Sequence, residues 1–242
     1  TTMTELANWV AGGMPTNYSA LAGYAFNPYD PRRDPREANA DGRPALATGG
    51  SGGGVGTTAS FWVGNVGTET SGSILSPANQ NSLVGIKPTH GLLSRTGIVP
   101  ISHTQDTPGP MARSVEDAAL LLGTMAGSDG EDPVTRDSDT RGLPDYSASL
   151  DPNGLKGARI GIVRNRLFGY SAAADRLAEN AIADLKKLGA EIVDPARLAS
   201  MFPGRELDTP EVADWLNKLE HAAPLVVGDD LVHAAPEPLR GE

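Results

Sequence analysis

The sequence contains no cysteine among its 242 residues. This absence excludes disulfides, thiolate metal sites and every mechanism that uses a cysteine nucleophile. The histidines offer no substitute, because all of them are scattered along the chain without the spacing of metal ligands. They are His90, His103, His221 and His233. We therefore expect no metal site.

Positive charge and long apolar runs are also scarce. The chain has 20 lysines and arginines against 30 acidic residues, which gives a formal net charge of −10. A nucleic-acid partner is not expected, because no basic stripe is present to neutralise phosphates. No apolar run is long enough to cross a bilayer, so a membrane partner is not expected either. The acidic balance is typical of a soluble protein.

The beginning of the chain carries no secretory signal. It opens at Thr1 as though within an element already under way, so we expect that the natural N-terminus is missing. The compartment therefore stays open between cytoplasmic and secreted, since proteins of both kinds can lack cysteine.

The later part of the chain has the pattern of an α/β layer. Arg159–Val163 is typical of a buried strand, and Glu191–Val193 of a second strand. Between them, Ala172–Leu188 predicts an amphipathic helix that ends at Gly189. The side of this helix that we expect to be buried carries Leu177, Ala181, Leu185 and Leu188. A strand, helix, strand series of this length indicates an α/β architecture.

The earlier part shows one well-defined helix and one unusual segment. Ser114 begins the helix with a capping-box pattern, and Gly127 lies just past its end. Residues 48–90 are rich in Gly, Ser and Thr, yet apolar residues run through them. We expect a packed segment with Trp62 and Val66 in the core. Two further helices are predicted, over Thr4–Val10 and Pro210–Leu219.

Two serines in this segment stand among glycines: Ser51 within Gly49–Gly54, and Ser73 within Thr68–Ile74. Glycine lets the backbone adopt otherwise forbidden angles and lets a substrate approach closely. Successive amides in such a turn can converge on one point, as an oxyanion hole requires. A phosphate-binding loop is the alternative, but neither G-x-x-x-x-G-K-[ST] nor G-x-G-x-x-G after a strand is present.

Several spaced blocks in this region resemble the signature of the amidase signature enzymes. The region runs from Thr48 to Leu122, and its blocks are Gly49–Gly54, Gly67–Ile74, Val84–Thr89 and Gln105–Ser114. Their number and order make the resemblance specific. In style, the run around Ser73 is closest to the amidases and peptide amidases that act on small or terminal amides.

The resemblance implies an α/β fold in which a mixed β-sheet core is surrounded by helices, incomplete in this chain. It implies an amidase signature domain over residues 1–195, with the core signature at 48–122, and an unassigned tail over 196–242. It also implies hydrolysis of the C–N bond of a small-molecule or peptide amide through a serine acyl-enzyme, without a cofactor.

The catalytic triad of the family is Ser–cis-Ser–Lys. By motif position, Ser73 is the expected nucleophile at the start of a short helix. Ser51 is expected to relay its proton and to follow a cis peptide bond. The expected oxyanion hole consists of the backbone amides of Thr70, Ser71, Gly72 and Ser73. The base is expected to be a buried lysine that stays neutral, because desolvation penalises its charged form.

The resemblance does not assign this base to Lys87, which stands in the block Val84–Thr89 that supports the site in the family. Thr1–Leu6 matches the stretch that follows the catalytic lysine, so this lysine is expected immediately before Thr1. We therefore expect the chain alone to be inactive. We also expect it to form a homodimer or to associate with a complementary segment of the same enzyme.

Two other interpretations stay open. One is that the chain comes from a glutamine-dependent amidotransferase, as its A subunit, which shares the signature and releases ammonia from glutamine. Leu75, at a position where the family often has arginine, and the insertion over Asp30–Ala47 argue against it. The other is a catalytically inactive scaffold that keeps the amidase fold.

Overall fold

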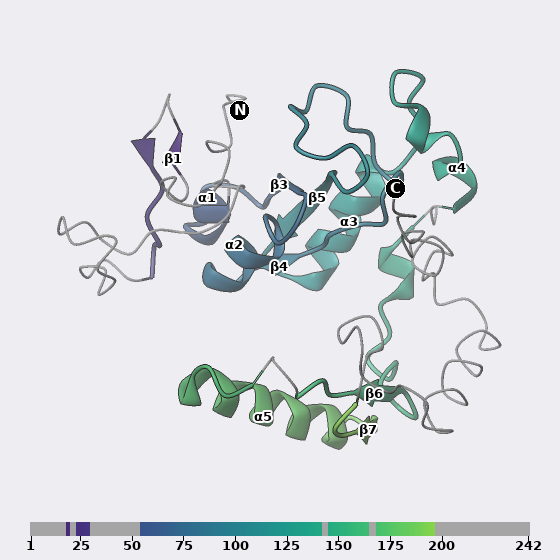
Figure 1. Ribbon diagram of the computed structural model, residues 1–242. Helices are drawn as coiled ribbons and strands as arrows, with labels where there is room; N and C mark the ends of the chain where they lie inside the picture. The colour runs from purple at the N-terminus through teal and green to yellow at the C-terminus, as the bar shows by residue number, and fades with distance from the viewer. Residues whose placement is uncertain (1–17, 20–22, 30–53, 142–144, 165–167, 197–242) are drawn as a thin grey trace, which may run out of the picture. The chain divides into compact units, whose positions relative to one another are not determined.

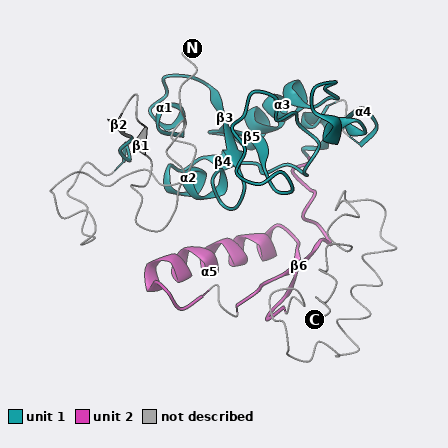
Figure 2. Ribbon diagram, turned by 45° about the horizontal axis from the view of Figure 1, so that its top comes forward, with its two compact units in different colours: residues 1–150 teal, residues 151–242 magenta. Residues whose placement is uncertain are grey.

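The computed structural model describes residues 18–19, 23–29, 54–141, 145–164 and 168–196. The chain divides into two compact units, residues 1–150 and residues 151–242 (Figure 2). The helices predicted over Thr4–Val10 and Pro210–Leu219 lie outside the described residues.

The first unit is built around a three-stranded antiparallel sheet with the strand order β3–β5–β4 (Figure 1). The strands are β3 (Gly64–Glu69), β4 (Val84–Gly85) and β5 (Thr107–Ala112). β5 is the central strand, and it pairs Thr107 with Glu69 at one end and Ala112 with Gly64 at the other. A separate antiparallel pair precedes the sheet in sequence and consists of β1 (Tyr18–Ser19) and β2 (Gly23–Tyr24).

Helices contact both faces of this sheet. They are α1 (Gly54–Thr58), α2 (Leu75–Gln80) and α3 (Val115–Met125). Successive strand residues face opposite sides. Gly109 faces Ile74, the residue before α2, whereas Gly64 faces Leu121 of α3. Three short helical turns follow α3: η2 (Pro133–Thr135), α4 (Ser138–Arg141) and η3 (Ser147–Ser149).

The ends of α3 confirm the sequence prediction. Ser114 is its N-cap, and the Ser114 hydroxyl accepts a hydrogen bond from Asp117 N at 3.0 Å. Gly127 follows the end of the helix with φ of +152°, a conformation that favours glycine. The local signals for starting and stopping this helix are therefore sufficient to place it.

β5 is completely buried although it contains two prolines, Pro108 and Pro110. A proline has no N–H and cannot donate to a sheet ladder. Ile86 N donates to Pro110 O at 3.0 Å, but the reciprocal bond is impossible, so the pairing with β4 ends there. Glycine is needed at position 109, because a Cβ on Gly109 would lie 2.1 Å from Ile86 O.

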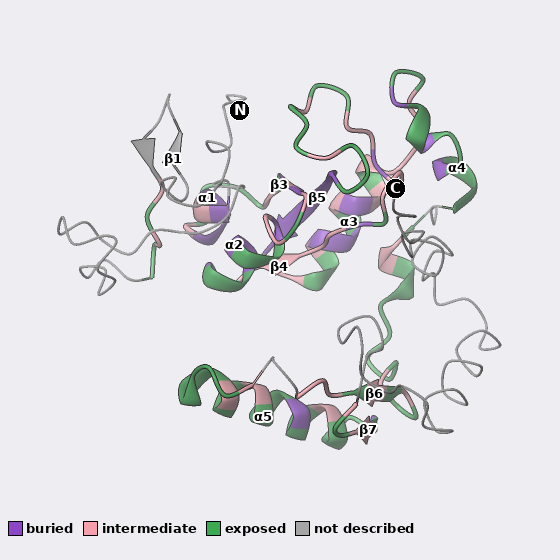
Figure 3. Cartoon of the chain, in the orientation of Figure 1, coloured by how far each residue is buried: buried purple, intermediate pink, exposed green. Residues whose placement is uncertain are grey.

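One part of the core of this unit lies between α2 and the sheet (Figure 3). It consists of Ile74, Ala78 and Met111, with Leu83 packed against them, and Ala118 and Leu122 of α3 are also buried. The prediction that Trp62 and Val66 lie in the core is wrong, because these side chains are 40% and 43% exposed.

Each of these two errors has a physical reason. Val66 lies on the same face of β3 as Gly64, where α3 contacts the start of the strand but leaves Val66 exposed, whereas Glu69 on the opposite face is buried. Trp62 lies in the turn after α1, where its ring fills the space beside Gly56 and its Nε1 donates to Thr57 Oγ1 at 2.8 Å. Burial in this segment follows close backbone packing and hydrogen bonding rather than apolarity.

The second unit is the strand–helix–strand motif that the sequence predicts. It consists of β6 (Arg159–Gly161), α5 (Ala172–Lys187) and β7 (Glu191–Val193), with the two strands parallel. Gly189 follows the helix with φ of +97°, as expected for a residue that ends it. Across the described parts of both units, no helix is long and apolar enough to cross a membrane.

Two details of this motif differ from the prediction. The first strand is shorter than Arg159–Val163 and is exposed at both ends, because β7 is its only described strand neighbour. The buried side of α5 is centred on Ile182, which is 5% exposed, whereas Leu177 is 71% exposed. The buried stripe is therefore shifted by one residue from Ala181, a rotation of about 100° around the helix.

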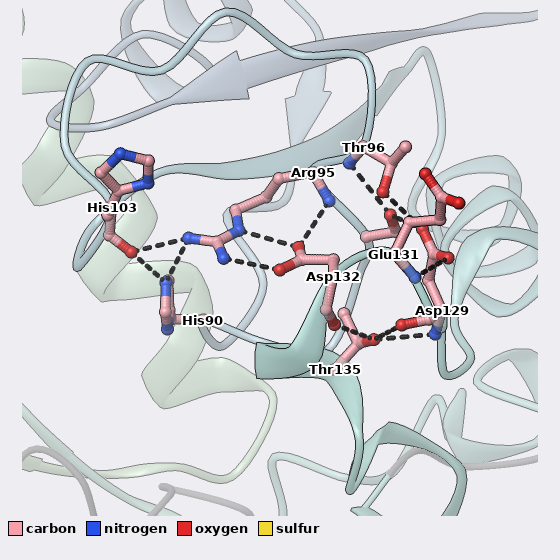
Figure 4. Close-up of polar contacts among 9 residues, drawn as sticks. His90, Arg95, Thr96, His103, Asp129, Glu131, Asp132 and Thr135 are labelled. Carbon is pink, nitrogen blue, oxygen red and sulfur yellow. Dashed lines mark hydrogen bonds and ion pairs between the residues drawn. The ribbon is translucent and has the colours of Figure 1, made fainter.

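A largely buried ion pair holds two connections of the first unit together (Figure 4). The Arg95 guanidinium donates to both carboxylate oxygens of Asp132, and Arg95 N donates to the same carboxylate at 2.9 Å. The remaining guanidinium nitrogen donates to His103 O at 2.6 Å. The hydrogen bonds from Arg95 are the main cause that lowers the pKa of Asp132 to about 2.

Asp132→Asn should lower the free energy of unfolding at neutral pH by about 1–2 kcal/mol. The folded pKa of Asp132 lies below its ordinary value of 3.8, so the carboxylate stabilises the fold at higher pH. This contribution is lost as the pH falls from about 4 to about 2, and the two proteins should converge in that window. Urea unfolding followed by circular dichroism across this pH range measures the difference.

Asp137→Asn is the control for this prediction, because the carboxylate of Asp137 is 57% exposed in its pair with Arg141. An exposed pair of this kind contributes about 0–1 kcal/mol. A stability difference between Asp132→Asn and the wild type that persists unchanged at the acidic end would contradict the role of the charge.

Candidate active site

Ser73 lies in loop 70–74, which joins the end of β3 to the start of α2. Ser73 is half-buried, and the next residue, Ile74, is fully buried in the core. The turn is closed by a hydrogen bond from Ser76 N to Gly72 O at 2.8 Å. Ser73 thus precedes α2 by one residue, Ile74, next to the helix start at which the sequence places it.

The carboxylate of Glu69 holds the far end of this loop. Glu69 is the last residue of β3 and is only 3% exposed. Its Oε2 accepts hydrogen bonds from Ile74 N at 2.7 Å and from Leu75 N at 2.9 Å. The first amides of a helix have no partner within the helix. Glu69 therefore satisfies two of them and closes the loop at the same time.

A second acidic residue holds the near end of the loop. Thr70 Oγ1 donates a short hydrogen bond to Asp106 Oδ1. The other oxygen of Asp106 accepts from Ile101 N at 2.7 Å and from Ser102 N at 2.8 Å. Burial alone would raise the pKa of Asp106, but these hydrogen bonds and the charge of Arg95 outweigh it and lower the pKa. The side chain therefore stays ionised as an acceptor.

Between these two anchors the loop carries four consecutive amides, those of Thr70, Ser71, Gly72 and Ser73. Within the described part of the chain, no group accepts a hydrogen bond from any of them. Gly72 has φ of +90°, and a Cβ there would meet no atom within 4 Å, so its backbone angle rather than space favours glycine. Consecutive unpartnered amides can bind an anion, and next to a hydroxyl they can stabilise the oxyanion that its attack creates.

The other expected site residues are not brought to this loop by the described structure. Ser51 lies outside the described residues, as does the peptide bond before it that is predicted to be cis; the chain is described again from Gly54. Lys87 Nζ donates to Gln105 O at 3.3 Å. In the ranges that the structure describes, no three His, Cys, Asp or Glu side chains are grouped to hold a metal ion.

Sequence reasoning missed the two acidic anchors, Glu69 and Asp106. A signal for them was present, because each is an acidic residue inside a block that is otherwise apolar or rich in Gly, Ser, Thr and Pro. A carboxylate in such a segment must be hydrogen-bonded if it is buried, because burying an unpaired charge is costly. This argument predicts the role but not the partners.

Glu69→Gln should loosen the loop while changing its shape little. A neutral amide oxygen accepts hydrogen bonds more weakly than a carboxylate, by about 1–1.5 kcal/mol. The amides of Ile74 and Leu75 should then exchange with solvent about tenfold faster, as measured by hydrogen exchange in NMR spectra. Glu116→Gln, on the exposed first turn of α3, is the control. Unchanged protection of both amides in Glu69→Gln would contradict the anchoring role.

Comparison with known sequences identifies a protein family for this chain. The family model described as Amidase matches residues 1–203 of this chain. A putative amidase of Arthroderma benhamiae is 41% identical over 221 residues, which cover 89% of this chain and 36% of that protein. The A subunit of the glutamyl-tRNA(Gln) amidotransferase from Afipia carboxidovorans is 40% identical over 182 residues, which cover 74% of this chain and 35% of that protein.

Comparison with solved structures agrees. The native peptide amidase of Stenotrophomonas maltophilia is similar with a TM-score of 0.68 and 41% identity, over 81% of this chain and 37% of that one. The chain thus spans about a third of the length of the relatives it matches. Because the family model matches most of the sequence and solved relatives share its mixed α/β fold, the chain belongs to the amidase family of amidase signature enzymes.

Proposed function

We propose that this chain carries the nucleophile of an amidohydrolase that cleaves carboxylic amide C–N bonds, with Ser73 as the attacking residue. The observation that carries the proposal is loop 70–74, in which a serine hydroxyl adjoins amides that have no acceptor among the described residues. Glu69 and Asp106 fix the two ends of this loop. An amide is a poor electrophile, so its hydrolysis needs both a positioned nucleophile and a stabilised oxyanion.

The reaction has two stages. Ser73 Oγ attacks the carbonyl carbon, and the carbonyl oxygen becomes an oxyanion that accepts hydrogen bonds from the unpartnered amides of residues 70–73. The C–N bond then breaks, the amine leaves with a proton, and an acyl-enzyme remains on Ser73. Water attacks this ester, releases the carboxylic acid and restores the serine.

Proton transfer in this proposal runs through Ser51. Ser51 accepts the proton of Ser73 and passes it to the neutral lysine that the family resemblance implies before Thr1. The same relay returns the proton to the leaving amine. The engagement of Lys87 Nζ by Gln105 O supports leaving Lys87 out of this role.

The similarity to a peptide amidase over most of the chain favours small or peptide C-terminal amides as substrates. The similarity to one component of an amidotransferase supports a second candidate, the release of ammonia from glutamine. Assays of the full-length protein separate the two. Ammonia released from a peptide amide without a partner supports the first, whereas glutamine hydrolysis that requires added partner proteins supports the second.

Ser73→Ala in the full-length protein should lower kcat for amide hydrolysis by at least about 10³-fold, because no acyl-enzyme can form. The circular dichroism spectrum should be unchanged, since Ser73 is half-buried and its hydroxyl has no hydrogen-bond partner among the described residues. Ser149→Ala, at an exposed serine of η3, is the matched control and should keep full activity.

A serine-directed phosphonate provides an independent check on this assignment. Mass spectrometry should find the adduct on Ser73 in the wild type and no adduct in Ser73→Ala. An adduct on another serine would contradict the assignment of Ser73 as the nucleophile. So would a Ser73→Ala variant that keeps more than about a tenth of the activity.

A further inference from the structure

Asp106 has an unusual position relative to loop 70–74. It lies directly before β5, and the sheet register places the next residue, Thr107, opposite Glu69 at the end of β3. Two carboxylates, Glu69 at 3% and Asp106 at 7% exposed, therefore stand at the end of the sheet where the loop leaves it.

These two carboxylates hold different halves of the loop. Glu69 accepts hydrogen bonds from the amides that follow Ser73. Asp106 instead accepts a hydrogen bond from the hydroxyl of Thr70, the residue at which the four unpartnered amides begin. Because these amides donate to no described residue, their direction depends on how the two ends of the loop are held.

Asp106 also connects the loop to the segment that precedes β5. Thr70 donates to one carboxylate oxygen of Asp106, and the other oxygen accepts hydrogen bonds from the backbone amides of Ile101 and Ser102. Three donors thus converge on one largely buried side chain, and the nearby charge of Arg95 favours its ionised form. Removing this acceptor would leave partly buried donors without partners, so the near end of the loop would move to satisfy them.

We propose that Asp106 is a positioning residue for the hydrolysis, which acts through the hydroxyl of Thr70 to direct the unpartnered amides of residues 70–73 at the oxyanion. The inference rests on the proposed function. It adds to that function a residue that does not touch the substrate.

The effect of this positioning should fall on the transition state. The loop amides stabilise an oxygen that becomes charged only as the bond to Ser73 forms, so a displaced amide loses more in the transition state than in the ground state. A displacement of about 1 Å can cost about 10²-fold in rate. Loss of the link from Asp106 to Thr70 should therefore lower kcat and leave KM nearly unchanged.

The test compares variants of the full-length protein in the hydrolysis of a simple aryl amide. Asp106→Asn keeps the shape, but its NH2 group cannot accept a hydrogen bond. Thr70→Val removes the hydroxyl without removing a charge. We expect kcat to fall about 10–100-fold in each variant, while KM changes by less than about threefold.

Two further variants show whether these residues act together. Thr70→Ser restores the hydroxyl and should recover most of kcat. The double variant Thr70→Val/Asp106→Asn should be no slower than the slower single variant, because residues that act through one contact are not additive.

Asp129→Asn is the matched control. The Asp129 carboxylate also accepts three hydrogen bonds, from the hydroxyls of Ser94 and Thr96 and from the backbone amide of Glu131. None of these partners belongs to loop 70–74. This variant should have a lower Tm than the wild type and an unchanged kcat.

Three results would overturn the proposal: an unchanged kcat in Thr70→Val, a rise of KM without a fall of kcat, or an equal loss of kcat in Asp129→Asn. Thr70→Val keeps the test decisive even if Asp106→Asn does not fold. The outcome is separable from the proposed function. If Ser73→Ala is inactive and Thr70→Val is fully active, only the positioning role fails, whereas an active Ser73→Ala removes the proposed function itself.

Discussion

The hydrogen bonds from the amides of Ile74 and Leu75 to the Glu69 carboxylate are the constraint on which the geometry of the candidate site depends. Bonds of this kind, to a charged acceptor, contribute about 1.5–3 kcal/mol each. They join the last residue of β3 to the first turn of α2, so the strand, the loop and the helix form one closed unit. Ile74 fixes the same unit from the core side, because its side chain packs there with Met111. Ser73 is held between a charged anchor and an apolar one.

The elements that the sequence predicts correctly are those whose signals are local. Ser114 caps α3 through the amide three residues on, and Gly189 ends α5 through its own backbone angle. The strand–helix–strand order of the second unit likewise follows from short periodic runs. In each case the interaction that determines the structure lies within a few residues of the sequence signal, so the element can be predicted from a single sequence.

The features that could not be predicted depend on partners that are distant in the chain. Whether Val66 is buried depends on how much of its face of β3 is covered, and the buried side of α5, centred on Ile182, likewise depends on what packs against that helix. The candidate site divides in the same way. The turn that carries Ser73 follows from its motif, but the contact of Asp106 with Thr70 requires the pairing of β3 with β5. Neither secondary-structure propensity nor hydrophobic periodicity predicts the register in which β3 and β5 pair.

The two prolines of β5 have a consequence for the unfolded chain. Six consecutive residues that are buried in the native sheet become accessible together on unfolding, and such a stretch could stack with copies of itself into cross-β fibrils. Pro108 and Pro110 are two residues apart, so both missing donors fall on the same edge of the strand. A stack of these strands would lack regular hydrogen bonds along that edge. The central strand of the native sheet is therefore a poor template for self-assembly when the chain is unfolded.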